Sequence, residues 1–323
     1  MKLLILRFSS IGDIILTSPV CRALNEAGHT VHYVSKAKFK MVLENNPNIN
    51  KLFTFKKEIT EIDHLLKVEN YDYIIDLHHN IRTKRLIAKL RRPVKSFNKL
   101  NYEKWLKIHL KLDILPPVHI VERYMNTLSF LNIKYDGKGL DYYINKNDED
   151  VFDNLEFNKT DKYTVFAVGG AHETKQIPKE LMITIGKRIK SKIVLLGSSD
   201  DVDKSESIKQ AIGSNCINLS GKLSLNQSAA VVKYSTNILT ADTGLMHIAA
   251  AYNRNIIAIW GNTIPEFGMY ALLADYSENK VYNAEVKDLK CRPCSKIGYK
   301  KCPKKHFDCM LKQDVEAIIN NIN

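Results

Sequence analysis

The segment Asn237–Gly261 (NILTADTGLMHIAAAYNRNIIAIWG) constrains the fold of this chain more than any other. The apolar runs Ile238–Ala241 and Ile256–Trp260 have the length of buried strands, and the alanine-rich stretch Leu245–Tyr252 predicts a short helix between them. A strand, a helix and a second strand in this order predict an α/β fold with a parallel sheet, because parallel strands need a crossover connection.

The loop Asp242-Thr243-Gly244, between the first of these strands and the helix, is predicted to hold phosphate. It would present the unpaired N–H groups of a helix N-terminus at the carboxyl edge of a sheet, where α/β folds bind phosphate groups. His247 lies four residues after Thr243 and so on the same helix face. The alternative is a simple helix cap, with Asp242 as the N-cap and His247 in the core.

The length of 323 residues predicts two domains, since single hydrophobic cores stop growing at about 250–300 residues. We expect a cytoplasmic protein, because Met1-Lys2 leads directly into a strand-like LLILRF and no apolar run approaches the ~20 residues of a membrane span. The six cysteines are then expected to be reduced, metal-bound or catalytic.

The first half predicts an open α/β sheet. Its predicted strands are Leu3–Arg7, Thr30–Ser35, Ile49–Phe55 and Tyr71–Leu77. The helix predicted from Asp13 to Gly28 bends or restarts at Pro19. The turn before it lacks the three glycines of a dinucleotide fingerprint, which argues against a nicotinamide enzyme. Asp13 would face the mouth of the sheet as a carboxylate, or else only complement the helix dipole.

Two polar loops follow strands of this first half, and we assign them to the acceptor or to phosphate. One is the turn with Ser9, Ser10 and Gly12, and the other is His78-His79, with Arg82 just beyond it. The paired histidines have no acid or cysteine at ligand spacing, so a substrate-facing loop or an exposed loop is expected there rather than a metal site.

Residues 82–111, here called the basic belt, hold eleven lysines and arginines against one acid, Glu103. Phe97, Tyr102 and Trp105 are interleaved. The belt accounts for most of the formal net charge of +13. Because like charges repel along helices, we expect an anionic macromolecule or membrane surface to face it, rather than solvent alone.

The polar stretch Asn145–Lys162 predicts a linker between domains at residues 1–145 and 146–323. The predicted strands after it are Tyr163–Val168, Lys192–Leu196, Cys216–Leu219 and Asn237–Ala241. The loop Gly169–Lys175, before a helix opened by Pro178, could hold phosphate but lacks the spacing of a P-loop. The Asp201-Val202-Asp203 sequence is interpreted as a helix start rather than a metal site.

Four cysteines, Cys291, Cys294, Cys302 and Cys309, form a cysteine-rich tail segment at 291–309. With one C-x-x-C pair they could form a structural zinc site, although the second pair is split by six residues, and His306 is a spare ligand. A loop rich in buried thiols is the equal alternative. In either case we expect a structural role outside the phosphate-binding motifs.

Three motifs in order carry a resemblance to a known family: LRFSSIGDIILTSPV at Leu6–Val20, TKQIP at Thr174–Pro178 and ADTGLMHIAAA at Ala241–Ala251. The chain resembles the family 9 glycosyltransferases, the ADP-heptose:lipopolysaccharide heptosyltransferases. The resemblance implies the GT-B fold, with two Rossmann-like α/β/α domains and a cleft between them. The N-terminal domain would bind the acceptor and the C-terminal domain the nucleotide sugar.

The resemblance also implies site residues. Asp13 matches the general base, and Lys175, beside Thr174, matches the lysine that neutralises the diphosphate. The residues that match the segment receiving the nucleotide diphosphate are Asp242, Thr243, Gly244, Leu245 and His247. Asp200 lies near the position of an acidic nucleoside contact. Ala171-His172 stands where some members carry a threonine pair.

The implied function is inverting transfer of a heptose or related sugar from ADP-heptose to a lipopolysaccharide core or related glycolipid. No obligatory metal is expected, because no convincing Asp-x-Asp is present, and the enzyme could lie at the cytoplasmic face of the inner membrane. The alternatives are a GT-B transferase or epimerase using a UDP- or GDP-sugar, and a nucleic-acid-binding protein using the basic belt. No RRM, KH or zinc-finger signature supports the last.

Overall fold

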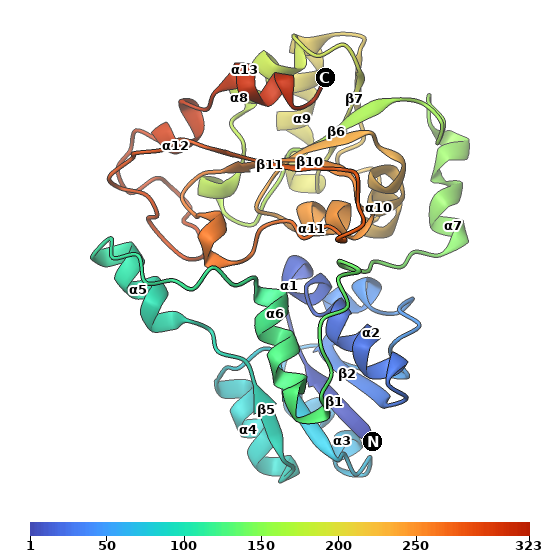
Figure 1. Ribbon diagram of the computed structural model, residues 1–323. Coiled ribbons are helices and arrows are strands. Elements are labelled where there is room, and N and C mark those ends of the chain that lie inside the picture. Colours follow the sequence, from blue (N-terminus) through green and yellow to red (C-terminus); the bar gives the residue numbers. More distant parts are fainter. The chain divides into compact units, whose positions relative to one another are not determined.

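The computed structural model describes residues 1–323, and the chain divides into two compact units (Figure 1). The first unit comprises Met1–Lys99 and Val118–Tyr143, and the second comprises Leu100–Pro117 and Ile144–Asn323. The predicted division near residue 145 placed Leu100–Pro117 in the first domain, whereas the structure places this segment in the second unit. Sequence order alone does not reveal this placement, because it depends on tertiary contacts.

The first unit is built on a five-stranded parallel sheet. Its strands are β1 (Lys2–Leu6), β2 (Thr30–Lys36), β3 (Lys51–Phe55), β4 (Tyr73–Asp76) and β5 (Val94–Ser96). Their order in the sheet is β3-β2-β1-β4-β5. The order reverses between β1 and β4, so the loops after these two strands diverge and leave room for a ligand at the carboxyl edge.

The helices of the first unit are α1 (Ile11–Ile15), α2 (Ser18–Glu26), α3 (Asp63–Lys67), α4 (Ile81–Leu90) and α6 (Ile120–Met125), with 3-10 helices at Ala37–Val42, Ile59–Glu61 and Asn126–Leu131. Helix α2 packs against α6, and α3 packs against α4. The predicted helix over residues 13–28 is in fact α1 and α2. Pro19 lies in the first turn of α2, which confirms the predicted restart, since proline is tolerated there.

The second unit is built on a six-stranded parallel sheet. Its strands are β6 (Tyr163–Ala167), β7 (Lys192–Leu196), β8 (Cys216–Asn218), β9 (Asn237–Ala241), β10 (Asn255–Trp260) and β11 (Val281–Glu285). Their order is β11-β10-β9-β6-β7-β8. The reversal lies between β6 and β9, which are the strands that precede the two predicted phosphate loops.

The helices of the second unit are α5 (Asn101–His109), α7 (Lys146–Glu149), α8 (Lys179–Gly186), α9 (Val202–Ile212), α10 (Leu225–Tyr234), α11 (Gly244–Ala251), α12 (Asp308–Leu311) and α13 (Val315–Asn320). Short 3-10 helices lie at Asp150–Asn154, Glu173–Lys175, Ser199–Asp201 and Pro265–Phe267. Helix α8 contacts α9 and α13, and α10 contacts α11. Asp201 is the N-cap of α9, which confirms the predicted helix start there. None of the helices is both long and apolar enough to cross a bilayer.

The central strands of both sheets are buried on both faces, as parallel sheets require. Leu3 to Leu6 in β1 and Ile256 to Trp260 in β10 are almost completely inaccessible to solvent. In the second unit, Phe166, Leu239 and Ile257 belong to one apolar cluster with side chains of α8, α9 and α13. Burial of these strands places their carboxyl ends firmly, so the loops that follow start from fixed positions.

The prediction of a linker over Asn145–Lys162 is wrong. The side chains of Phe152 and Phe157 are buried in the second unit, where their ring centroids lie 5.8 Å apart. The Glu149 carboxylate accepts from Lys233 Nζ at 2.6 Å and from Tyr234 Oη at 2.9 Å. The polar composition of this segment masked two buried aromatic residues and a well-bonded carboxylate.

Candidate functional site

An ion pair lies at the sheet reversal of the first unit. Arg7 directly follows β1, and its Nη2 lies 2.6 Å from Asp13 Oδ1. The other carboxylate oxygen of Asp13 accepts from the Ser10 backbone N at 3.1 Å and from Ser10 Oγ at 2.7 Å. The Asp13 side chain is 21% exposed and that of Arg7 10%, so the carboxylate is the more accessible partner.

The surroundings of Asp13 keep it ionised. Burial by itself raises the pKa of a carboxyl group, but the Arg7 charge and the Ser10 hydrogen bonds together outweigh burial. The pKa of Asp13 therefore lies below its usual value, and the side chain is a carboxylate at neutral pH. A carboxylate in this state can accept a proton.

Sequence reasoning missed Arg7, which holds this corner together. Its Nε donates to Ser9 O at 2.8 Å, and its Nη1 donates to Leu77 O at 2.6 Å and to Tyr124 Oη at 3.1 Å. One guanidinium thus joins the ends of β1 and β4 and helix α6. A charged residue that directly follows an apolar strand was the available signal, because that position is the carboxyl edge of the sheet.

The loop after β4 is organised by Asp76, another residue that sequence reasoning missed. Its buried carboxylate accepts from the backbone N of His78 at 3.1 Å and of His79 at 2.7 Å, and from Thr83 Oγ1 at 2.8 Å. These bonds fix the path of the predicted His78-His79 loop beside the Arg7–Asp13 pair.

His78 is brought to this corner, but as a neutral group. Burial and the nearby positive charges of Arg7 and Lys99 lower the pKa of His78 to about 3. Its ring packs on Phe8 with centroids 4.8 Å apart, and its Nδ1 is buried without a hydrogen-bond partner. His78 therefore offers a neutral hydrogen-bonding group at this corner rather than a positive charge, and its contact with the acceptor or a phosphate stays a prediction.

The other residues predicted to bind the acceptor or phosphate have different surroundings. Gly12 is buried inside α1, and the Ser9 carbonyl accepts from Arg7, so both shape the corner. His79 adopts a positive φ of 48°, and its Nδ1 lies 3.2 Å from Phe97 O. Arg82 is half-buried in the first turn of α4.

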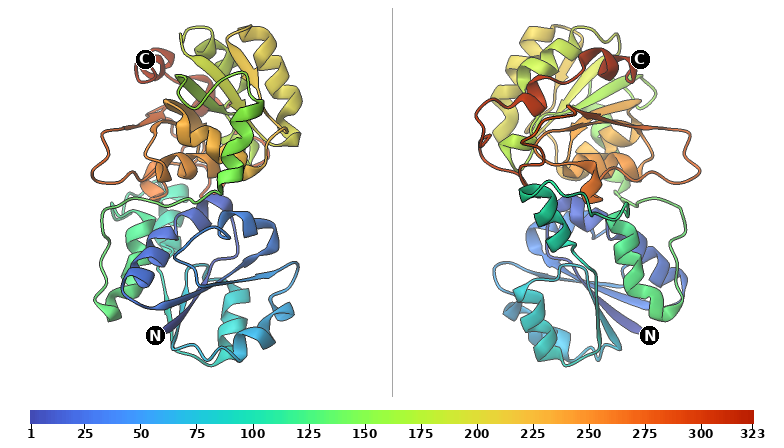
Figure 2. Two further views of the ribbon diagram at one scale, coloured as in Figure 1. Left: turned by 90° about the vertical axis from the view of Figure 1, so that its right-hand side faces the viewer. Right: turned by 60° about the vertical axis from the view of Figure 1, so that its left-hand side comes forward.

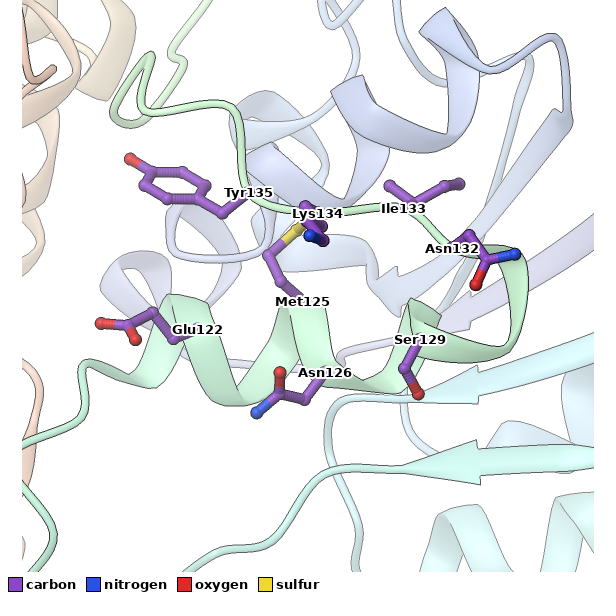
Figure 3. Close-up of a pocket in the computed structure, with 8 residues that line it drawn as sticks. All are labelled: Glu122, Met125, Asn126, Ser129, Asn132, Ile133, Lys134 and Tyr135. Atoms are coloured by element: carbon purple, nitrogen blue, oxygen red, sulfur yellow. The ribbon is translucent and has the colours of Figure 1, made fainter.

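The first unit also contains a cavity of about 390 Å³ between α6, the 3-10 helix that follows it and the next loop (Figure 3). Its lining residues are Glu122, Met125, Asn126, Ser129, Asn132, Ile133, Lys134 and Tyr135. None of the residues predicted for the acceptor belongs to this lining, so the cavity does not coincide with the Arg7–Asp13 corner.

A second ion pair lies at the sheet reversal of the second unit. Lys175, after β6, places Nζ 2.5 Å from Oδ2 of Asp242, which follows β9. Thr263 Oγ1 donates to the same oxygen at 3.4 Å. Here the Lys175 side chain is 16% exposed and that of Asp242 13%. Because Asp242 is committed to the ammonium group, it positions Lys175 rather than meeting an anionic diphosphate itself.

The start of α11 completes this corner. Thr243 is the N-cap in extended conformation and makes no side-chain cap, and Gly244 and Leu245 are half-exposed in the first turn. A Cβ added at Gly170 would lie 3.6 Å from Thr243 Cγ2, so the loops after β6 and β9 lie side by side. The free N–H groups of α11 and the Lys175 ammonium together favour an anion.

Three residues predicted for the donor are placed elsewhere. The Thr174 hydroxyl is buried, donates to Tyr299 O at 3.1 Å and accepts from Tyr299 N at 2.8 Å. Its side chain is therefore not available to a donor. His247 is buried in α11, which fits the core interpretation. Asp200 is exposed on the 3-10 helix before α9.

Asp201 and Lys204, neither of which was predicted as a site residue, hold the loop after β6. A Cβ at Gly169 would come within 2.2 Å of Asp201 Oδ2, so only glycine lets the loop pack on that carboxylate. Lys204 Nζ donates to Ile177 O at 2.8 Å, and burial lowers the pKa of Lys204. These contacts tie the Lys175 loop to α9.

The cysteine-rich tail segment contacts the donor loop, which corrects the expectation that it lies outside these motifs. Gly298 packs against His172, Tyr299 bonds Thr174, and Cys294 N donates to Asn262 O at 3.0 Å. All four cysteines are free, and no three ligating side chains are gathered closely enough to hold a metal ion in this arrangement. Cys291 Sγ lies 3.8 Å from His306 Nε2, and the tetrahedral zinc site considered above stays a prediction.

The basic belt does not form one surface within one unit. Residues 82–99 belong to the first unit and residues 100–111 to the second. Several of its charges are already paired or packed, as Lys89 with Asp63 at 2.7 Å and Lys95 over the Phe130 ring. Arg91 and Arg92 remain exposed.

Comparison with known proteins agrees with this geometry. The family model for glycosyltransferase family 9 (heptosyltransferase) matches residues 59–304. Lipopolysaccharide heptosyltransferase 1 of Campylobacter coli is 28% identical over 294 residues, which cover 81% of this chain and 84% of that protein. Lipooligosaccharide heptosyltransferase 2 of Haemophilus influenzae is 40% identical over 92 residues, 27% of this chain and 25% of that protein.

Solved structures show the same fold. A glycosyltransferase family 9 protein of Veillonella parvula superimposes with a TM-score of 0.78 at 20% identity, covering 99% of this chain and 95% of that chain. The E. coli ADP-heptose lipopolysaccharide heptosyltransferase II superimposes with a TM-score of 0.70 at 19% identity, covering 99% of both chains. The predicted GT-B fold is confirmed.

The family model spans both units, and the two sheet reversals carry the motifs on which the resemblance was based. This chain belongs to glycosyltransferase family 9, the heptosyltransferase family, and is a glycosyltransferase.

Proposed function

We propose that the protein transfers a heptose, or a closely related sugar, from ADP-heptose to a lipopolysaccharide core or related glycolipid. The observation that carries this proposal is the pair of ion pairs at the two sheet reversals. One offers an accessible carboxylate, Asp13, and the other an accessible ammonium group, Lys175. Sugar transfer from a nucleotide diphosphate needs a base for the acceptor hydroxyl and positive charge for the leaving group.

In the first unit, Asp13 takes the proton of the attacking acceptor hydroxyl. The lowered pKa makes Asp13 a weak base, so the proton moves as the new C–O bond forms, when the hydroxyl oxygen becomes acidic. Arg7 stays charged throughout and stabilises the carboxylate orientation. His78, neutral beside this pair, can hydrogen-bond an acceptor hydroxyl without adding charge.

In the second unit, the diphosphate leaves as the bond from the anomeric carbon to its oxygen breaks. Lys175 Nζ and the N–H groups at the start of α11 stabilise the negative charge that develops on it. Asp242 holds Lys175 in place. Because a single base activates the hydroxyl for direct attack opposite the leaving group, the anomeric configuration inverts.

The donor and acceptor are proposed from the relatives. The curated relatives are named lipopolysaccharide and lipooligosaccharide heptosyltransferases, and a solved E. coli heptosyltransferase is described with ADP-2-deoxy-2-fluoro heptose. A glycolipid acceptor would be embedded in a membrane, so we place the enzyme in the cytoplasm, at the inner face of the inner membrane.

Product analysis tests the proposal. The purified protein is mixed with truncated lipopolysaccharide and, in separate reactions, with ADP-heptose, UDP-sugars or GDP-sugars. Of the donors tested, we expect only ADP-heptose to give a heptose-extended glycolipid, detected by mass spectrometry. NMR should show that the anomeric centre of the product is inverted. Extension with a UDP- or GDP-sugar, and none with ADP-heptose, would contradict the proposal and favour the other nucleotide-sugar enzymes.

A further inference from the structure

Helix α5 exposes two large aromatic side chains and buries a lysine. Trp105 is 51% exposed and Tyr102 68%, whereas Lys104 and Leu106 on the same helix are buried. Three further apolar side chains just after the helix are also about half exposed, namely Leu110, Leu112 and Ile114. We call Tyr102, Trp105, Leu110, Leu112 and Ile114 the α5 apolar face.

The two exposed aromatic residues depart from the usual amphipathic pattern, in which the apolar side of a helix faces the core. The helix is nevertheless firmly placed in the second unit. Lys111 Nζ donates to Pro293 O at 3.0 Å, and Lys296 Nζ donates to Asn101 Oδ1 at 3.0 Å. Five exposed aromatic and aliphatic side chains within one short, anchored segment indicate an interaction surface rather than scattered exposure.

Residues 287–305, here called the basic tail, lie beside α5 through these same bonds (Figure 2, right). The basic tail contains eight lysines and arginines against one acid, Asp288. The exposed members are Lys287, Lys290, Lys296, Lys300, Lys301, Lys304 and Lys305. Ile297 and Tyr299 are exposed among them.

We propose that the α5 apolar face and the basic tail together dock on an anionic lipid membrane. Tryptophan and tyrosine favour the membrane–water interface, and aliphatic side chains enter the acyl boundary. Lysines beside them attract anionic headgroups. This proposal rests on the proposed function, in which the acceptor is a glycolipid held in a membrane. It adds the surface by which the enzyme would bind that membrane.

Charge and side-chain type favour a membrane over other occupants. A second copy of this chain would bring an equally basic tail to the same place, and like charges would oppose the contact. Nucleic acid would satisfy the lysines and could stack on the aromatic rings. It would leave Leu110, Leu112 and Ile114 without an apolar partner.

Vesicle cosedimentation tests the proposal without donor or acceptor. We expect the protein to bind vesicles of phosphatidylethanolamine with phosphatidylglycerol and to bind phosphatidylcholine vesicles much more weakly. The triple variant Trp105→Ser, Leu110→Ser, Leu112→Ser should lose roughly 10-fold or more in partitioning, because the apolar area is removed. The control Tyr276→Ser, which changes another exposed aromatic residue of the second unit, should bind as the wild type does.

Tryptophan fluorescence gives a second readout. The chain has two tryptophans, and Trp260 is buried, so a shift of emission to shorter wavelength on adding anionic vesicles reports Trp105. The variant Trp105→Phe should lose the shift but keep most of the binding. Raising salt should weaken binding of the wild type, because headgroup attraction is screened.

Several outcomes would overturn the proposal: no vesicle binding by the wild type, equal binding by the triple variant, or vesicle-independent dimers that the triple variant dissociates. Preferential binding of RNA or DNA over anionic vesicles would do the same. Transfer to a water-soluble acceptor fragment should be unchanged in the triple variant. If the wild type binds vesicles but transfers no sugar, the proposed function fails and the membrane surface stands.

Discussion

The ion pairs Arg7–Asp13 and Lys175–Asp242 occupy equivalent places in the two units, yet they are built in opposite senses. In the first unit the guanidinium donates to three other oxygens and is nearly buried, while the carboxylate is the more exposed partner. In the second unit the lysine bonds only Asp242 through its side chain, and the carboxylate is the less exposed partner.

The difference shows how one fold can supply two kinds of chemistry. A sheet reversal creates room at the carboxyl edge of each sheet, but it does not decide the sign of the charge offered there. The two pairs differ in how the cation is held, because Arg7 donates to three other oxygens and Lys175 Nζ donates only to Asp242. In the proposed reaction the first unit uses the more exposed carboxylate, and the second uses the ammonium hydrogens that make no other bond.

The largest expected effect is that of Asp13→Asn. Removing the base should lower turnover by about 100-fold or more while donor affinity stays near that of the wild type, because the loss falls on the transition state. Turnover with saturating donor and isothermal titration with the nucleoside diphosphate provide the two measurements. Asp63→Asn, which removes a carboxylate paired with Lys89 in the same unit, is the matched control and should change turnover little. Equal weakening of binding and turnover by Asp13→Asn would indicate a helix-capping role.

Lys175→Ala should come next in size and act on binding. Affinity for the nucleoside diphosphate should fall roughly 10- to 100-fold, as expected for a hydrogen bond to a charged group, while affinity for the nucleoside stays constant. Asp242→Asn and Thr243→Val should cost less, because both leave the ammonium group present. Lys192→Ala, a partly exposed lysine of the same unit, is the control. An unchanged ratio of the two affinities would remove Lys175 from the diphosphate site.

Arg7→Lys sharpens the contrast through pH. In the wild type the pKa of Asp13 is lower in the folded state than in the unfolded state, where it is about 3.9. The ion pair therefore stabilises the fold above about pH 3.9, and this stability is lost as the pH falls through the folded-state pKa. Lysine cannot reproduce the guanidinium bonds. The acidic limb of the turnover profile should therefore move to higher pH, with donor affinity unchanged. An unmoved limb would show that Arg7 does not set the Asp13 pKa.

Cys294→Ser should have the smallest effect. Its Sγ donates only to Cys291 O at 3.0 Å, and a serine hydroxyl can make the same bond, so the thermal midpoint should change little. Elemental analysis of protein purified without added metal should find well below one zinc per chain. One zinc per chain, lost together with thermal stability in this variant, would instead establish the zinc site.

Parallel strands were predictable where they are long and apolar. Lys192–Leu196 and Asn237–Ala241 were predicted with the bounds that the structure has. Strand β5 was missed because its three residues are all exposed at the sheet edge and carry no apolar run. Strand β11, Val281–Glu285, was missed because only one of its residues is buried. Edge strands pack on fewer neighbours, so their sequences are less constrained.

The candidate site was predicted in the same uneven way. Asp13, Lys175 and the Asp242–Gly244 loop were found because motif spacing places them at strand ends. Arg7 was missed because it acts through bonds to Leu77 and Tyr124, which are distant in sequence. Asp76 was missed although its partners are near it in sequence, because a single acid at the end of an apolar run does not show which groups donate to it. Thr174 was assigned to the donor because it adjoins Lys175, although its hydroxyl bonds the backbone of Tyr299.

The sequence by itself determined the two parallel sheets, which follow from apolar runs and local turn chemistry, and its three motifs carried the resemblance to the family. The tertiary structure decided the strand order, and so which loops meet at each sheet reversal. The tertiary structure alone decided which member of each ion pair stays accessible and that residues 100–117 join the second unit. It also brought α5 beside the basic tail. Exposure and pairing depend on groups that approach from far along the chain, and neither spacing nor composition records those approaches.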